Sequence, residues 1–556
     1  MGQSNEDVEA TRARIPQKYH YQDTSLPTWR FWALSVGLCL GLFLSMLDAS
    51  IVATSLYTIG TDFDSMDLIN WVALAYTLTY LSCAVLVARV SDVVGRRNAF
   101  LASFVIFFAF SLGCGFSQSL EQLVACRALQ GLGGSGLYSI TMIIFPEVAP
   151  KHLLQHVSSL VGMVIASAGV LGPVLGGILT HYASWRWIFW MNGPIGFVSL
   201  LVFYLAWPDA KHLPNLQRRT WKELDFVGSI LLVAASVLVV SSFQNVGNDG
   251  EEWTRAVFIA PVTAGSICFM LLLAWETLVP RLRNNRIMAA IPIRLLRNRV
   301  YLATIFNTML LGFPYLLIIY AFPIHMQVVN GKSSLLAGLF LLPMLGSVAL
   351  GTALGGIVNK SKNRLFETMT VASCFMALGC GLMTTLSSSV DLEPKALGFL
   401  TFVGFGFGLS ATSSTIIGAT ESEISDHAPA QAIIAQVRIL GGSLGIAAST
   451  AILVSFIRKD LTGVVGSEHL PSLHGVGMSL TDAQAVAVRQ AYTDSFRKDM
   501  QMGTILSGIA ILLSLGIYRR NRVTFEEQRQ IQIKNEVERR RRASATTTLV
   551  SSTTTD

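Results

Sequence analysis

The sequence predicts an all-α polytopic membrane protein with about fourteen transmembrane helices. Hydrophobic residues make up 52% of its 556 residues and charged residues only 13%, whereas soluble domains carry roughly 25% charge. The mean hydropathy is +0.53. A chain of this length with so few charges could not cover its own surface in water, so most of that surface is expected to face lipid.

Fourteen apolar runs are long enough to cross a bilayer, because a transmembrane helix needs about 20 residues. The first 28 residues are polar and lack the order of a cleaved signal, so the first run is expected to remain as a span. The runs lie near residues 30–52, 69–90, 98–117, 121–145, 154–180, 187–207, 224–243, 256–278, 300–322, 335–358, 367–388, 394–420, 430–457 and 496–518.

Lysine and arginine orient these spans, since cytoplasmic loops carry an excess of both. Alternate loops are basic, and the loops between them are acidic or sparse in charge. The basic set contains Arg89, Arg96, Arg97, Lys151, Lys211, Arg218, Arg219, Lys222, Arg281, Arg283, Arg286, Arg294, Arg297, Arg299, Lys360, Lys362 and Arg364. The other set contains Asp62, Asp64, Asp67, Glu121, Asp249, Glu251 and Glu252. Both termini are therefore expected in the cytoplasm.

The pattern weakens after residue 364. The loop at 421–429 is acidic although the span count places it inside. The segment 458–492 should lie outside, and Thr481 and Asp482 before an alanine-rich stretch predict a capped helix lying at the surface. The tail from 519 to 556 contains four consecutive arginines before Ser544, and we expect it to be solvated and disordered. A tail held on anionic lipid and read by a basic-directed kinase is the alternative.

A charged island separates the second and third apolar runs. Residues 88–97 read A-R-V-S-D-V-V-G-R-R. This resembles the loop pattern G-x-L-[AS]-D-[RK]-x-G-R-[RK] of the major facilitator superfamily, matching it at Asp92, Gly95, Arg96 and Arg97. It departs at Ala88, where glycine is usual, and at Val93, where a basic residue is usual. The resemblance implies a solute transporter.

Six further segments are similar to the fourteen-span drug:proton antiporters of that superfamily, including fungal-type multidrug and toxin efflux transporters. They are L-D-A-S-I-V-A at 47–53 with Asp48, W-V-A-L-A-Y-T-L at 71–78 with Trp71 and Tyr76, R-A-L-Q-G-L-G-G at 127–134 with Arg127 and Gln130, G-P-V-L-G-G at 172–177 with Gly172, Pro173, Gly176 and Gly177, W-R-W-I-F-W-M-N-G-P at 185–194 with Trp190 and Asn192, and R-I-L-G-G-S-L-G at 438–445 with Arg438, Gly441 and Gly442.

The resemblance implies the major facilitator fold, with two six-helix bundles related by a pseudo-twofold axis along the membrane normal and two inserted helices. The expected parts are a cytoplasmic tail at 1–29, an N-terminal bundle at 30–207, inserted helices seven and eight with basic loops at 208–299, a C-terminal bundle at 300–518 and a basic, Ser/Thr-rich cytoplasmic tail at 519–556.

Asp48 and Arg127 are the clearest charges inside the spans, where an ionised group costs about 2.5–3.5 kcal/mol. Asp48 lies roughly 25 Å along its helix from Phe31, and Arg127 roughly 9 Å into a helix that starts outside, so the two can share a level. Arg127 would then keep Asp48 ionised until a proton or a cationic substrate competes, as a proton antiporter requires. A structural ion pair, or an aspartate capping a helix end, is the alternative.

Two further sets of motif residues predict how the protein closes. Gly172, Gly176 and Gly177 allow close helix approach and Pro173 bends the helix, so this helix could seal the interface against proton leak or simply pack tightly. Asp92 is expected to face the positive N-terminal end of the thirteenth helix, near Pro429, and to latch the inward side. The alternative is that the arginines beside it only set topology.

Candidate residues for a substrate cavity are Trp71, Tyr76, Tyr80, Trp190 and Asn192, with Gln130 as a further hydrogen-bonding group. A wide apolar cavity with few polar groups suits amphipathic organic compounds. For each aromatic residue, packing or interfacial anchoring is the competing interpretation.

The leading hypothesis is a proton-coupled exporter of small organic compounds, such as drugs or secondary-metabolite toxins, which acts as a monomer in the plasma membrane. The alternatives are a vacuolar transporter of basic amino acids, which would need an acidic cavity, and a transporter-like sensor. Few acids besides Asp48 lie well inside the spans, with Asp225 and Glu276 near helix ends. No motif indicates an enzyme, a cofactor, a metal site or nucleic-acid binding, and the seven cysteines lie unpaired in apolar runs.

Overall fold

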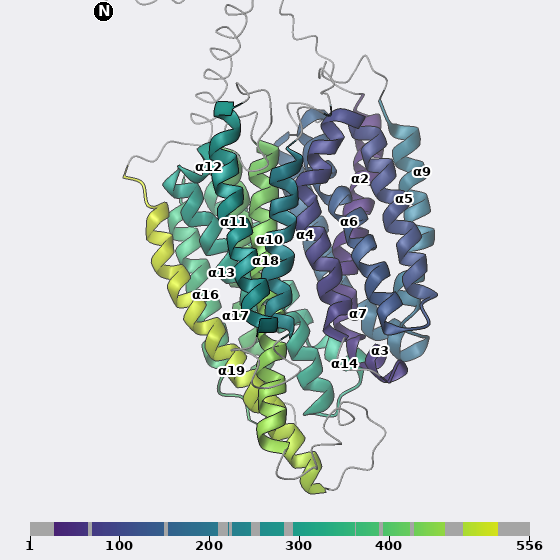
Figure 1. Ribbon diagram of the computed structural model, residues 1–556, viewed down its shortest axis with the longest axis vertical. Coiled ribbons are helices and arrows are strands. Elements are labelled where there is room, and N and C mark those ends of the chain that lie inside the picture. Colours follow the sequence, from purple (N-terminus) through teal and green to yellow (C-terminus); the bar gives the residue numbers. More distant parts are fainter. Residues whose placement is uncertain are drawn as a thin grey trace, which may run out of the picture.

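The computed structural model describes residues 27–64, 69–148, 154–208, 221, 225–245, 256–282, 293–361, 363–387, 393–422, 427–461 and 482–520. Within these ranges the regular structure is helical throughout, and fourteen helical segments are long and apolar enough to cross a membrane. The expected number of spans is therefore confirmed. The helices stand side by side as two groups (Figure 1).

The first group contains six spans. They are α2 (Thr28–Ile51) with η1 (Val52–Thr54), α4 (Ile69–Val94), α5 (Arg96–Gly115), α6 (Leu120–Val148), α7 (Leu154–Tyr182), and α8 (Trp187–Trp190) with α9 (Asn192–Ala206). The short α3 (Leu56–Asp62) follows η1. Helix α2 packs against α6, α7 and α9, and α4 packs against α6. A phenylalanine-rich core that includes Phe100, Phe104 and Phe203 holds this group together.

The second group repeats that pattern. Its spans are α13 (Arg299–Val328), α14 (Ser334–Leu339) with α15 (Leu342–Ser361), α16 (Leu365–Met383), α17 (Lys395–Thr420), α18 (His427–Leu461), and α19 (Asp482–Ser514) with η7 (Leu515–Ile517). The first of these spans packs against the fifth and sixth, and the second against the fourth, as in the first group.

Two inserted helices stand between the groups in chain order. They are α10 (Phe226–Asn245) and α11 (Ala256–Leu282), and the short α12 (Ile293–Leu296) precedes α13. Helix α10 packs against α4 of the first bundle and α18 of the second through Val85, Leu232 and Ala432. Helix α11 lies beside α10 (Figure 1) and packs against it, and many of its apolar side chains are exposed. The insertion therefore covers one seam between the bundles.

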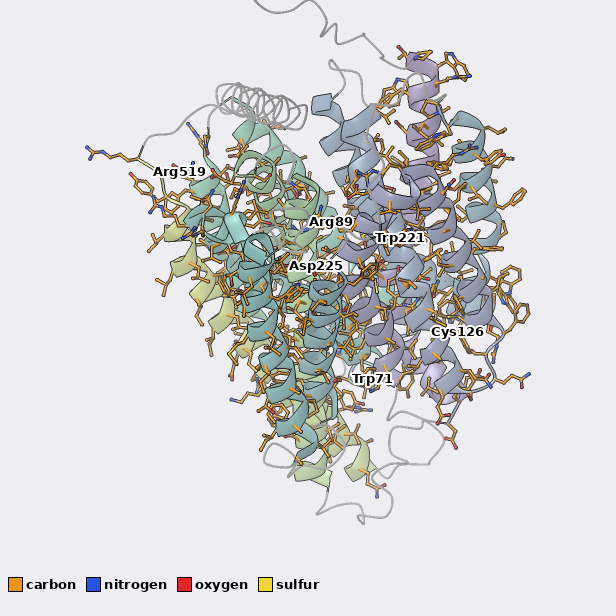
Figure 2. The ribbon with its side chains drawn as sticks, turned by 45° about the horizontal axis from the view of Figure 1, so that its top comes forward. Trp71, Arg89, Cys126, Trp221, Asp225 and Arg519 are labelled. Atoms are coloured by element: carbon orange, nitrogen blue, oxygen red, sulfur yellow. The ribbon has the colours of Figure 1, made fainter. Side chains whose placement is uncertain are left out.

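The bundles meet along two seams of the same kind, each between the second span of one bundle and the fifth of the other. These are α4 with α18, and α7 with α14 and α15. We call the end of the molecule where α4 ends and α13 begins the basic-loop end, and the other end, where α7 ends and α14 begins, the acidic-loop end. Figure 2 shows Arg89 and Arg519 toward the former, and Trp71 and Cys126 toward the latter.

The helix predicted after residue 481 is present and begins at Asp482, but it is not a separate helix at the surface. Residues 482–514 form one continuous helix, and its first turns pack against the end of α18 instead of lying apart. Ala491 is fully buried there, beside Ile457. The alanine-rich stretch supplies an apolar face that α18 covers, so the helix runs on into the fourteenth span without a break.

Candidate functional site

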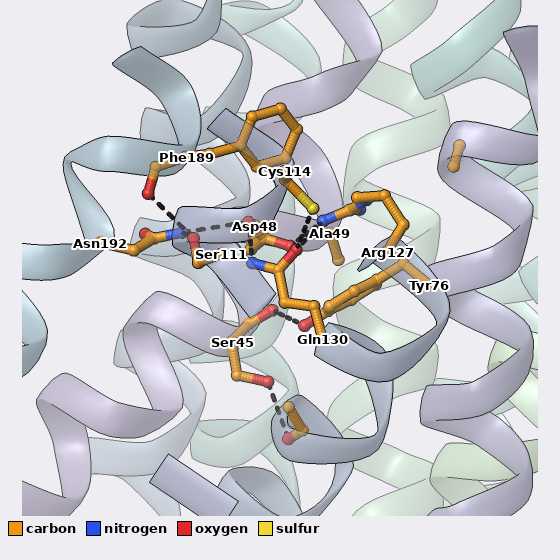
Figure 3. A network of polar contacts seen from close by, with 12 residues as sticks. Ser45, Asp48, Ala49, Tyr76, Ser111, Cys114, Arg127, Gln130, Phe189 and Asn192 are labelled. Carbon is orange, nitrogen blue, oxygen red and sulfur yellow. Dashed lines mark hydrogen bonds and ion pairs between the residues drawn. The ribbon is translucent and has the colours of Figure 1, made fainter. Parts of the chain in front are cut away.

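A buried polar cluster lies inside the first bundle and is centred on the carboxylate of Asp48 (Figure 3). Asp48 and Arg127 both have 0% exposed side chains, and Arg127 Nη1 donates to Asp48 Oδ2. Asp48 comes from α2 and Arg127 from α6, and the expectation that they share a level is met. A sealed ion pair of this kind requires further hydrogen bonds to offset the lost hydration.

Two amides supply those bonds. Gln130 Nε2 donates to Asp48 Oδ1 over 3.0 Å, and Asn192 Nδ2 donates to the same oxygen over 3.1 Å. The Gln130 carbonyl oxygen in turn accepts from Arg127 Nη1 over 2.9 Å. Gln130 lies one helical turn after Arg127 on α6, so both reach the same place. The carboxylate is therefore held by three donors from α6 and the sixth span.

Asn192 reaches this site from the sixth span, Trp187–Ala206, which continues through Met191 with helical backbone angles (φ −60°, ψ −27°). Helix α8 ends at Trp190 and α9 begins at Asn192. The Asn192 amide also donates to Ser111 Oγ over 2.9 Å, and that hydroxyl donates to the Phe189 carbonyl over 2.8 Å. Helices α5, α8 and α9 are thus tied to the Asp48 cluster.

Two aromatic rings lie against the guanidinium of Arg127. Its central carbon lies 4.3 Å from the Tyr76 ring centroid and 5.6 Å from that of Phe189. Its Nε donates to the Val72 carbonyl over 3.0 Å, whereas Nη2 is buried without a partner. The Tyr76 hydroxyl donates to the Ser45 carbonyl over 2.8 Å. Tyr76 therefore belongs to this cluster through cation–π and hydrogen-bond contacts.

A hydroxyl from the second bundle contacts the chain directly beside Asp48. Tyr320 of α13 donates to the Ala49 carbonyl over 2.6 Å. The hydrogen bond joins the first span of one bundle to the first span of the other. A change at Asp48 that moves its backbone would therefore act on a contact between the bundles.

The remaining aromatic candidates lie in different places. Tyr80 is buried, stacks on Tyr76 with ring centroids 5.8 Å apart, and leaves its hydroxyl without a partner. Trp71 is half-buried against the apolar core. Trp190 lies against Gly115, where an added Cβ would be 2.0 Å from its indole nitrogen, and beside Phe116. The structure thus packs Trp190 on the end of α5 and does not join it to the other candidates.

The helix-five glycines divide between two partners. A Cβ at Gly172 would lie 2.0 Å from Ser50 Oγ, and one at Gly176 would lie 2.2 Å from the Ile51 carbonyl oxygen, so both face α2 of their own bundle. A Cβ at Gly177 would lie 2.8 Å from the Ser334 carbonyl oxygen of α14. The Pro173 carbonyl accepts from Thr54 Oγ1 over 3.2 Å. Only Gly177 faces the seam between the bundles.

The glycines of the thirteenth span pack within the second bundle. A Cβ at Gly441 would lie 2.0 Å from the Met309 carbonyl oxygen, and one at Gly442 would lie 2.1 Å from Leu316 Cδ1. These contacts bring α18 tightly against α13. The Arg438 side chain is directed elsewhere, and its Nη2 donates to Ser414 Oγ of α17 over 2.7 Å.

The loop between α4 and α5 is held by its own residues. Asp92 Oδ1 pairs with Arg96 Nη1 over 2.6 Å, and the same Arg96 nitrogen donates to Ser91 Oγ over 2.5 Å. Gly95 begins α5 with a φ of 96°, which favours glycine. Arg97 stacks its guanidinium over the Tyr204 ring at 4.6 Å. The expected contact between Asp92 and the start of α18 is not among the described contacts, and the side chains of residues 427–429 lie outside the described part.

Replacing Asp92→Asn is expected to favour the conformation that is open at the basic-loop end, because the Asp92 charge holds Arg96 in this loop. The measurement is maleimide labelling of single cysteines, Val93→Cys at this end and Thr58→Cys at the other, in a cysteine-free background. Asp494→Asn, which removes a more exposed carboxylate on α19, is the control. Unchanged labelling at both ends would contradict a gating role for Asp92.

Three acids that the sequence placed near helix ends or passed over are buried. Asp225 accepts from the Trp275 indole over 2.8 Å, and Glu276 on α11 has an exposed fraction of 1%. Asp499 of α19 also has 1% and accepts from Ser449 of α18 over 2.5 Å, while its other oxygen is unpartnered. The sequence signal that could have identified Asp499 is its position inside the fourteenth apolar run, where a charged residue is unusual.

The arrangement of helices and the buried charge cluster define a class of protein, the secondary transporters with two six-helix bundles. A bacterial homolog of the human lysosomal transporter Spinster, solved in an inward-facing and unoccupied conformation, superposes with a TM-score of 0.58 at 15% identity. The alignment covers 89% of this chain and 100% of the bacterial protein. This likeness shows the fold.

The sequence profile of the Major Facilitator Superfamily matches residues 38–450, and the chain belongs to that superfamily. The MFS-type transporter FPY5 of Fusarium mangiferae is 29% identical over 93% of this chain and 88% of its own length. The efflux pump roqT of Penicillium rubens is 26% identical over 88% and 91%, respectively. The MFS efflux transporter aclA of Aspergillus oryzae is 26% identical over 88% and 90%. The protein is a transporter and not an enzyme.

Proposed function

We propose that the protein exports small amphipathic organic compounds, such as drugs or secondary-metabolite toxins, in exchange for protons. The observation that carries this proposal is the Asp48 carboxylate, buried in the membrane and bonded to Arg127, Gln130 and Asn192. A carboxylate that changes charge inside a bilayer is a means of coupling proton movement to conformation. The relatives named efflux pump and efflux transporter support the direction of transport.

Coupling follows from the neighbours of Asp48. Protonation removes the charge that Arg127 and the two amides hold, so their bonds to the carboxylate weaken. The Ala49 carbonyl, one residue further on, accepts the Tyr320 hydroxyl of the other bundle. A shift of α2 at this point therefore changes a contact between the bundles. Alternating access would follow as the bundles rock about the site.

The basic loops support an orientation in which the basic-loop end and both termini lie in the cytoplasm. Export then means loading at that end and release at the acidic-loop end. We place the protein in the plasma membrane, where such release removes a compound from the cell, and treat it as a monomer.

The test is efflux of a panel of lipophilic compounds from cells that lack or overproduce the protein, with and without a protonophore. We expect overproduction to lower accumulation of at least one compound, and the protonophore to abolish the difference. Uptake of lysine or arginine by vacuolar vesicles, with no lipophilic compound exported, would contradict the proposal. Efflux that persists with the protonophore would contradict proton coupling but not export of the compound.

A further inference from the structure

A second arginine lies within the membrane and, unlike Arg127, has no carboxylate against it among the residues that the structure describes. Arg438 of α18 is half-buried, and among the described residues its hydrogen bonds reduce to the one from Nη2 to Ser414 Oγ, at 2.7 Å. The Nε and Nη1 atoms of Arg438 take no part in that hydrogen bond, and they are not sealed from solvent, whereas Nη2 of Arg127 is buried without a partner. Arg438 therefore keeps N–H donors that a ligand can reach.

Aromatic side chains from both bundles lie near this guanidinium. It lies 5.8 Å from the Phe407 ring centroid on α17, and Tyr315 of α13 stacks on that ring with centroids 3.4 Å apart and planes 5° apart. Tyr138 of α6, from the first bundle, is close enough to interact with it electrostatically, as is Tyr315. Tyr138 in turn contacts Tyr80 of α4, at 6.0 Å between ring centroids.

These residues occupy the central part of their helices, within about 9 Å of one another in depth. At 1.5 Å per residue, Arg438 and Tyr138 lie roughly 15–17 Å from the basic-loop ends of their helices, and Phe407 and Tyr315 roughly 20–24 Å. That depth is near the bilayer midplane, where transporters of this architecture bind substrate at the interface of their repeats. The α7 helix passes there too, because a Cβ at Gly169 would lie 3.9 Å from both the Tyr315 hydroxyl and Leu345 Cδ2.

A structural reason for this charge is weak. The motif glycines already fix α18 against α13, since Gly441 lies against the Met309 backbone and Gly442 against the Leu316 side chain. One hydrogen bond to a serine needs no guanidinium, and a charged group without an anion is costly at this depth. An anionic ligand would supply the missing partner, since a guanidinium binds a carboxylate through two parallel hydrogen bonds.

We infer that Arg438, Tyr138, Tyr315 and Phe407 form the substrate subsite, and that it takes flat unsaturated compounds carrying a carboxylate. The carboxylate pairs with the free N–H groups of Arg438, and the unsaturated body lies along the Tyr315–Phe407 stack. This inference rests on the proposed transport function and narrows its substrate class to organic acids. Arg438 also repels cationic cargo, including basic amino acids.

The test is equilibrium binding to the purified full-length protein in detergent. The probes are matched pairs of aromatic carboxylic acid and neutral carboxamide, from benzoate to anthracene carboxylate. For at least one pair we expect wild type to bind the acid about tenfold or more tightly than the amide, because only the acid forms charge-assisted bonds. Arg438→Gln should reduce that ratio to about one without weakening amide binding. Arg438→Lys should give an intermediate ratio, because lysine keeps the positive charge but cannot form the two parallel hydrogen bonds of a guanidinium.

Arg497→Gln, which removes an arginine outside the subsite on α19, should keep the wild-type ratio. Equal affinity for acid and amide in every wild-type pair would overturn the inference, as would an equal loss of both in Arg438→Gln. If Arg438→Gln does not give a monodisperse protein, the wild-type and Arg438→Lys ratios decide. Binding needs no proton gradient, so the two proposals can fail separately. If proton-driven efflux is absent but the preference for the acid is intact, the proposed function is contradicted and the subsite is not.

Discussion

The Asp48→Asn variant is expected to lose proton-driven transport by about 100-fold, near the upper limit of a coupling free energy of 1–3 kcal/mol. Asparagine keeps the shape of the side chain but cannot take up and release a proton. The measurement is efflux from proteoliposomes under an imposed pH gradient. Substrate counterflow, which exchanges labelled for unlabelled substrate without net proton movement, should persist.

Removing the Asp48 charge also leaves Arg127 buried without its anion, and breaking one partner of such a pair costs roughly 3–5 kcal/mol of stability. The variant's size-exclusion profile must therefore be compared with that of Asp48→Asn combined with Arg127→Gln, which buries no net charge. Asp62→Asn, which removes an exposed acid after the same span, should transport normally. Proton-driven efflux at the wild-type rate in a folded Asp48→Asn protein would exclude Asp48 as the coupling group.

The architecture could be predicted from composition because lipid imposes length and hydropathy on each span. Fourteen spans follow from apolar runs alone. The continuity of the helix after residue 481 with the fourteenth span could not be predicted, since its first turns depend on the apolar face of α18 around Ile457. Whether an alanine-rich segment lies apart or joins a span is decided by its neighbour and not by its own residues.

The site was predictable where residues lie on regular helices. Asp48 and Arg127 could be brought to one level by counting residues at 1.5 Å each. The contact of Asn192 with Asp48 and that of Trp190 with Gly115 depend on how the sixth span packs against α2 and α5. Both are tertiary contacts, for which the apolar pattern carries no signal. The hydrogen bond from Tyr320 to the Ala49 carbonyl joins residues 271 positions apart, so no local sequence pattern could predict it.

The acidic-loop end closes where two glycines, one from each bundle, let α7 and α14 touch. A Cβ at Gly338 would lie 2.4 Å from the Pro173 carbonyl oxygen, and one at Gly177 would lie 2.8 Å from that of Ser334. Gly338→Val is therefore expected to hold the bundles apart here, because overpacking costs roughly 1–3 kcal/mol, a shift of about 5–150-fold in a two-state equilibrium. Efflux should fall by about tenfold or more.

The separation itself can be measured at Thr54, which is fully buried beside Gly338. In a cysteine-free background, Thr54→Cys should react with an impermeant maleimide about tenfold faster in the Gly338→Val protein. Gly356→Val is the matched control, since a Cβ at Gly356 meets no atom within 4 Å, and it should change neither labelling nor efflux. The smaller Gly177→Ala change should leave a gap that admits protons, visible as faster decay of an imposed pH gradient in proteoliposomes. If Gly338→Val abolishes efflux while Thr54→Cys stays protected, the glycine contact serves assembly of the bundles and not their opening and closing.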